Sequence, residues 1–141
     1  MRVRKSVHPL LLEPTYWRNR LEGMRLERQS LMITPRPDLS GHGREVVEFV
    51  LRAHDGERLW GLFARPSWRR GPWPARIRSV GPADRPEVDT DLLENGQAEF
   101  VFQEPAGRRL EDRVLDVVRV CQVAFQTVGI DRLQVRFDFA A

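Results

Sequence analysis

Ser79, two histidines and an aspartate are the first residues to consider, because their types could support acyl transfer. Ser79 ends a strand-like run, His54 stands next to Asp55, and His42 lies between two glycines in the segment SGHG. A serine nucleophile needs a base that accepts its proton, and the base needs a group that orients it. No base stands at a recognisable spacing from Ser79. Ser79, His54 and His42 are thus candidate catalytic residues that no motif supports.

Simpler roles explain the same residues. Asp55–Gly56 is a pair that tolerates positive φ and is typical of a hairpin turn. The chain has no H-x-x-x-H or C-x-x-C spacing, and GPADRP is too short and proline-rich to cradle a phosphate. We therefore expect no metal site and no cofactor.

Composition narrows the class of protein. The chain has 141 residues, of which 30% are charged and 41% hydrophobic, as in a single soluble domain. No apolar run approaches the ~20 residues of a membrane span. The apolar run at 10–12 is too short for a signal peptide. Cys121 is the sole cysteine, so no intrachain disulfide is possible and we expect a cytoplasmic protein with an inert core thiol.

A basic and aromatic stretch raises the question of nucleic acid. In WRRGPWPARIR, at 68–78, two tryptophans alternate with arginines: Trp68, Arg69, Arg70, Trp73, Arg76 and Arg78. Tryptophan rings on which bases stack, together with arginines that neutralise phosphates, are typical of proteins that bind single-stranded nucleic acid. The net charge is only +3, however, which favours a solvated loop. We therefore favour a partner other than nucleic acid and treat Trp68 and Trp73 as a possible protein contact surface. A basic and aromatic nucleic-acid-binding protein is kept as an alternative function.

The pattern of apolar residues predicts one domain over 1–141. Its parts are an N-terminal helix and loop at 1–45, with the helix at 14–28 and the loop at 34–43, a hairpin at 46–66, and a βαβαβ-like unit at 75–139. Within that unit the strands are expected at 75–80, 98–103 and 132–139, a short helix at 87–95, and a long helix at 109–127. The hairpin is the clearest local signal, and the apolar residues of the long helix recur at intervals of three and four.

The order of elements carries a family resemblance. The hairpin contains a D-G-x-x-L-x-G…P pattern made by Asp55, Gly56, Leu59, Gly61 and Pro66. With LLENGQAEFVFQEPAGR at 92–108 and VGIDRLQV at 128–135, it resembles the N-terminal half of an α/β hydrolase, in the acetyl xylan esterase and dienelactone hydrolase branch. The resemblance implies a truncated sheet of about five strands, in the order 1-2-4-3-5, with the first antiparallel and a long helix after the fourth.

The same resemblance implies that the catalytic machinery is missing. In the family a Gly-x-Ser-x-Gly elbow follows the last strand seen here, and the acid and histidine come later still. This sequence contains no such motif, and Pro82 has no N–H to donate in the loop that would form an oxyanion hole. We expect a non-catalytic protein. The alternatives are a minimal hydrolase using Ser79 with His54 or His42, and a split enzyme completed by a second chain.

The last strand alternates between apolar and polar residues. Its apolar residues are Leu133, Val135, Phe137 and Phe139. The helix 109–127 should pack on the face that bears Leu133, Val135 and Phe137, and the short helix should cover the opposite face thinly. This alternation also fits a rival fold, an antiparallel α+β two-layer sandwich.

The last strand is expected at an edge of the sheet, where unpaired backbone groups invite pairing. We therefore expect a homodimer, with possible interface residues Trp68, Trp73, Leu133, Val135, Phe137 and Phe139. The alternatives are a separate protein partner and a monomer in which the helix 14–28 covers the open region.

Overall fold

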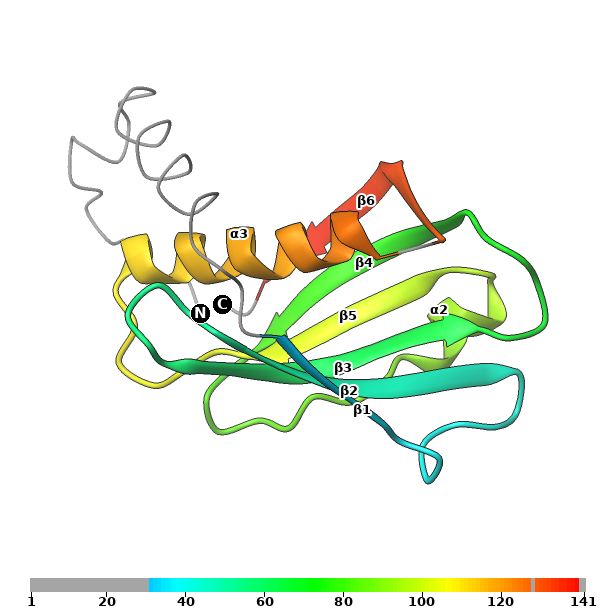
Figure 1. The fold of residues 1–141 in the computed structure, drawn as a ribbon, viewed down its shortest axis with the longest axis horizontal. Helices are drawn as coiled ribbons and strands as arrows, with labels where there is room; N and C mark the ends of the chain where they lie inside the picture. Colours follow the sequence, from blue (N-terminus) through cyan, green and yellow to red (C-terminus); the bar gives the residue numbers. More distant parts are fainter. Residues whose placement is uncertain (1–30, 128, 140–141) are drawn as a thin grey trace.

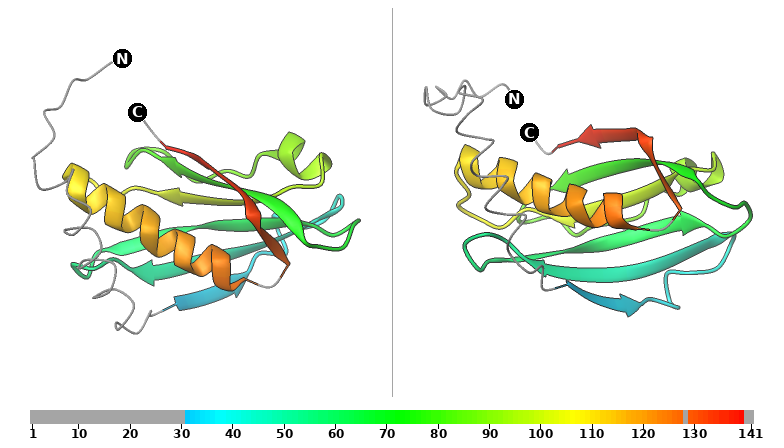
Figure 2. Two further views of the ribbon diagram at one scale, coloured as in Figure 1. Left: turned by 90° about the horizontal axis from the view of Figure 1, so that it is seen from above. Right: turned by 45° about the horizontal axis from the view of Figure 1, so that its top comes forward.

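A computed structural model describes residues 31–127 and 129–139 of the chain. They form a six-stranded sheet in the order β1-β2-β3-β5-β4-β6 (Figure 1). Its elements are β1 (Leu31–Pro35), β2 (Arg44–Arg52), β3 (Arg58–Pro66), β4 (Trp73–Val80), α2 (Thr90–Glu94), β5 (Ala98–Gln103), α3 (Leu110–Gln126) and β6 (Ile130–Asp138). The helix expected at 14–28 lies outside the described residues. Figure 2 shows α3 crossing one face of the sheet, with β1 and β6 at opposite edges.

The sheet is mixed, which decides between the two expected folds. β4 pairs in parallel with both β5 and β6, so the antiparallel sandwich is wrong. The hairpin strands β2 and β3 are antiparallel, as expected, but the strand that runs against the rest of the sheet is β3 and not the first hairpin strand, because β3 is also antiparallel to β5. Chain length explains this: residues 67–72 are too few for the crossover that a parallel β3 and β4 would need.

The sheet has six strands where five were expected. The five expected strands follow one another in the expected order, but β1 is added beside β2, with Leu31 opposite Leu51. All five residues of β1 are exposed, so buried and exposed residues do not alternate along the strand. It was not predicted, and part of β1 falls in the loop expected at 34–43.

The main core lies between α3 and the sheet. Val120, Val123 and Ala124 of α3 pack against residues of β2 to β5, including Phe49 and Phe100. Phe63 stacks on Phe100 with ring centroids 4.3 Å apart. This confirms the prediction that the long helix packs on the sheet.

A smaller core lies on the opposite face. There Leu93 of α2 packs with Val46, Leu62, Ala64 and Val101. Asp89 begins α2, because its side chain accepts from the N–H groups of Asp91 and Leu92. The short helix therefore covers the face on which it was expected.

The contact expected between α3 and the last strand is only partly present. Val135 packs against the main core, but Leu133 is 95% exposed. The pairing of β6 with β4 moves from Trp73–Ile130 to Ala75–Val135, so the residues between form a bulge. Asp131 holds this bulge by accepting from the backbone N–H of Leu133 and the side-chain amide of Gln134. The placement of Leu133 on the core face is thus wrong.

Within residues 31–127 and 129–139, none of the helices has the length and apolar character needed to cross a membrane.

The close approach of β3 and β5 at Gly61 gives a first testable prediction. A Cβ at Gly61 would lie 2.1 Å from the carbonyl oxygen of Val101 and 2.9 Å from the Phe49 ring. We expect Gly61→Ala to lower the free energy of unfolding by about 1–3 kcal/mol, because the backbone must shift. In Gly81→Ala, the matched control, the nearest atom is a side-chain oxygen of Asp84 at 3.2 Å, so the change should stay within about 0.5 kcal/mol. Urea unfolding followed by circular dichroism measures both. Equal stability of the two variants would contradict this packing.

Candidate functional site

An apolar groove lies between α3 and the end of β6. Its cavity volume is about 350 Å³, and five of its seven lining residues are apolar: Leu110, Val114, Val117, Val118 and Phe139, with Glu104 and Arg113. The four apolar residues from α3 recur at intervals of three and four, so they form one stripe along the helix. We call these residues, together with Phe137, the α3–β6 face.

The aromatic side of this face comes from β6. Phe137 pairs with Ile77 of β4, so it lies on the same side of the sheet as the main core. Phe137 and Phe139 are each 47% exposed, with ring centroids 5.9 Å apart. Among the described residues β6 is the last strand of the sheet, so an apolar stripe runs beside an unpaired strand edge.

The charged end of the groove is an ion pair. Arg113 donates through Nε to Glu104 Oε1 at 2.7 Å and through Nη2 to Oε2 at 3.1 Å. The Ser79 hydroxyl donates to Glu104 Oε2 at 3.3 Å. The hydrogen bond that Arg113 donates to Glu104 raises the pKa of Arg113, so the guanidinium stays charged. Because both carboxylate oxygens are engaged, Glu104 is poorly placed to act as a base toward Ser79.

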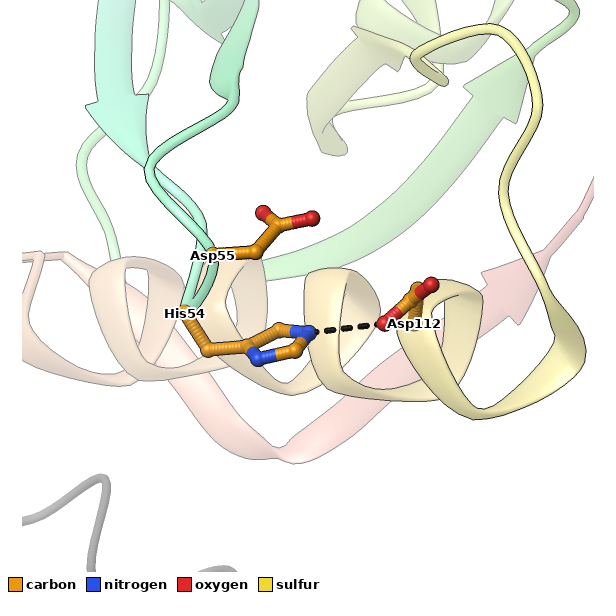
Figure 3. A group of neighbouring side chains, drawn as sticks. All are labelled: His54, Asp55 and Asp112. Carbon is orange, nitrogen blue, oxygen red and sulfur yellow. Dashed lines mark hydrogen bonds and ion pairs between the residues drawn. The ribbon is translucent and has the colours of Figure 1, made fainter.

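A second polar cluster joins the β2–β3 turn to the start of α3. His54 Nε2 lies 2.9 Å from Asp112 Oδ1, and ligand atoms of His54, Asp55 and Asp112 all lie within 4.8 Å of one another (Figure 3). Of the described residues, these three are a group whose atoms could hold a metal ion. Asp55 already forms an ion pair with Arg108, however, and Asp112 lies 3.6 Å from Arg109.

Arg108 gives this cluster a structural role. It pairs with Asp55 on the turn and with Asp116 on α3, where Nε donates to Oδ2 at 2.9 Å. The hydrogen bond from Arg108 lowers the pKa of Asp55, whereas burial raises the pKa of Asp116 despite the same partner. The cluster thus fastens the hairpin to the N-terminal turn of α3, and its carboxylates are counter-ions to arginines.

A third polar cluster covers the face that carries α2. Glu99 is fully buried, and its carboxylate accepts from Nε of Arg76 at 2.8 Å and from Nη2 of Arg78 at 3.2 Å. Asp89 joins the cluster through Arg76 Nη2 at 2.9 Å. The arginines that alternate along β4 therefore neutralise an internal carboxylate.

The remaining candidates are dispersed. Ser79 is 4% exposed, whereas His42 lies on an exposed loop with φ 53°. Trp68 is 56% exposed, but the possible interface residue Trp73 is only 6% exposed and belongs to the main core. Ser79 is hydrogen-bonded to Glu104, and His54 is hydrogen-bonded to Asp112. Neither of these hydrogen bonds joins the candidate serine to a candidate histidine.

The candidate nucleic-acid residues are likewise separated. Arg76 and Arg78 are ion-paired with Glu99, while Arg69 and Arg70 lie on an exposed loop. Glu99 was missed in the sequence, although a lone acidic residue in the apolar run AEFVFQ was the available signal. Cys121 packs against the main core, and burial raises the pKa of its thiol to about 11, as expected for an inert thiol.

Comparison with known proteins identifies the fold. No protein-family model matches the chain, and no curated protein matches its sequence. Solved structures with the same fold include an acetyl xylan esterase from Paenibacillus sp. R4, with a TM-score of 0.71 and 13% identity over 89% of this chain and 50% of that one. Acetyl xylan esterase 1 from Thermoanaerobacterium sp. JW/SL YS485 gives 0.69 and 14%, over 90% and 50%.

The chain therefore spans about half the length of these esterases. At such identities the likeness shows the fold, which is that of part of an α/β hydrolase.

The Glu99 cluster gives a second testable prediction. We expect Glu99→Gln to lower the free energy of unfolding by about 3–5 kcal/mol, because two partly buried arginines lose their shared counter-charge. The matched control is Glu45→Gln, which breaks an exposed pair with Arg65 and should cost less than about 1 kcal/mol. Urea unfolding of both variants measures the difference. A Glu99→Gln protein as stable as the control would show that the cluster does not hold this face of the sheet.

Proposed function

We propose that this chain is a non-catalytic α/β-hydrolase-like module that binds a protein through the α3–β6 face. The observation that carries the proposal is the apolar groove of about 350 Å³ beside the edge of β6. A strand in a parallel sheet is usually covered on both faces, yet Phe137 and Phe139 remain half exposed. Apolar surface of this kind commonly marks a site of association.

The edge strand favours a protein over a small ligand. A small molecule could fill part of the groove, but it would leave the outward backbone groups of β6 without partners. A polypeptide can satisfy both surfaces, because its backbone extends the sheet while its side chains enter the groove.

The surroundings of Ser79 and His54 support the absence of catalysis. Ser79 is nearly inaccessible and donates to Glu104, whose charge Arg113 already neutralises. His54, on the β2–β3 turn, is hydrogen-bonded to Asp112 at the start of α3 and not to Ser79. A nucleophile needs both access and a base, whereas Ser79 is only 4% exposed and the carboxylate to which it donates is already paired with Arg113.

An esterase remains the second candidate, because both reported structural neighbours are acetyl xylan esterases. Ser79 stands near the carboxyl end of β4, the edge where ligands bind in open α/β sheets. A minimal enzyme would use Ser79 directly with His54 or His42. A split enzyme would obtain its nucleophile from a second chain bound at the α3–β6 face.

An ester hydrolysis assay tests the proposal and separates these candidates. We expect the purified chain to hydrolyse p-nitrophenyl acetate no faster than its Ser79→Ala variant, since Ser79 is not an activated nucleophile. Ser79→Thr, which keeps a hydroxyl, serves as the matched variant. Turnover that is lost in Ser79→Ala but retained in folded Ser79→Thr would establish a minimal esterase. Turnover that arises only with a second hydrolase-like polypeptide would establish a split enzyme, and either result would overturn the non-catalytic proposal.

A further inference from the structure

The edge of β6 has a straight part and a bulged part. Residues 135–138 pair in regular parallel register with residues 75–78 of β4, whereas residues 131–134 form the bulge. A bulge protects a strand edge from pairing by turning it away from the sheet. The protection therefore covers only the first half of β6 and leaves the straight part, which carries Phe137, available for pairing.

We propose that the partner bound at the α3–β6 face is a second copy of this chain, joined by antiparallel pairing of the two β6 strands about a twofold axis at Phe137. This inference rests on the protein-binding function proposed above and names its partner. Twofold pairing is the most common arrangement of soluble oligomers. The pairing would continue the sheet across the axis.

The register follows from charge. A twofold axis perpendicular to the sheet leaves each side chain on the same face of the sheet in both copies. Residues directly opposite each other share a face, whereas neighbouring residues in a strand do not, so one residue must lie opposite itself at the axis. Centring on Phe137 places Arg136 opposite Asp138 of the second copy, twice in the dimer. Centring on Arg136 would place it opposite Arg136 of the second copy, and like charges directly opposite each other are destabilising. Centring on Val135 would require pairing through the bulge.

The two charged residues are accessible for this contact. Arg136 is exposed and donates through Nη2 to Gln97 at 3.0 Å, which leaves its other guanidinium donors available. Asp138 is exposed, and its carboxylate forms no hydrogen bond or ion pair with another described residue. Opposite charges across such an interface mainly select the register and partner, while buried apolar surface supplies most of the affinity.

The apolar face completes the match. With the axis at Phe137, the Phe137 rings of the two copies lie opposite each other. Val135 lies opposite Phe139 of the second copy. These residues lie on the side of the sheet covered by α3. The grooves of the two copies then flank the axis on one side of a continuous sheet, so the half-exposed phenylalanines become covered.

Sedimentation equilibrium of the full chain at micromolar concentration tests the dimer. We expect a mass about twice that of the 16.4 kDa chain. Arg136→Asp and Asp138→Arg should each raise the dimer dissociation constant by about tenfold or more, because each creates two like-charge pairs. The double variant Arg136→Asp with Asp138→Arg restores opposite charges in the same register and should recover the wild-type constant. Arg132→Asp, a charge reversal in the bulge, is the matched control and should change nothing.

Two results would overturn the proposal. One is a monomeric wild type, which would mean that another polypeptide or residues 1–30 occupy the face. The other is a dimer unaffected by the single reversals and by Phe137→Glu, which would place the interface elsewhere. A monomer would leave the ester hydrolysis result unchanged, so this inference and the non-catalytic proposal fail separately.

Discussion

The buried carboxylate of Glu99 determines which residues must surround it on one face of the sheet. A carboxylate removed from water costs several kcal/mol unless it is paired and hydrogen-bonded. Here the guanidinium groups of Arg76 and Arg78 and the backbone N–H of Asp89 supply those partners. The cluster joins β4, β5 and the segment before α2, and it places paired charges beside the smaller apolar core on that face. The main core lies on the other face, which carries α3.

The two ends of the α3 face differ in how well they are covered. Over β2 to β5 the helix closes the core, and Arg108 links Asp116 in the second turn of α3 to Asp55 on the β2–β3 turn. At β6 the bulge turns Leu133 outward, whereas Ile130 belongs to the main core and Val135 packs against it. The result is an apolar groove beside a strand edge, which is the surface that the proposed binding function uses. The fold is similar to about half of the acetyl xylan esterase structures. The proposed function rests on this surface and not on that similarity.

Local features of the structure could be predicted from the sequence, and features that depend on register could not. The periodicity of α3 and the Asp55–Gly56 turn are encoded within a few residues, so both were identified. The burial of Glu99 depends on its position opposite Arg76 in a neighbouring strand. Outward placement of Leu133 depends on side-chain hydrogen bonds from Asp131, which alternation of apolar and polar residues does not reveal.

Strand β1 and the candidate site show the same limit. β1 is defined only by its pairing with β2, since its own residues are all exposed. The apolar residues of β6 and α3 were recognised separately, but the groove between them requires their relative placement. Trp73 was expected on a surface, and it became a core residue because the chain returns to the sheet there.

Hydrogen exchange in the segment 130–139, measured at two protein concentrations, tests most directly whether the α3–β6 face binds a second copy. Outward N–H groups of residues 135–138 gain partners only in the dimer, so their exchange should slow as the concentration rises. The opposite edge of the sheet, β1 at Leu31–Pro35, provides the internal reference and should exchange at the same rate in both samples. Exchange in 130–139 that is independent of concentration, while sedimentation shows a monomer throughout, would contradict the account.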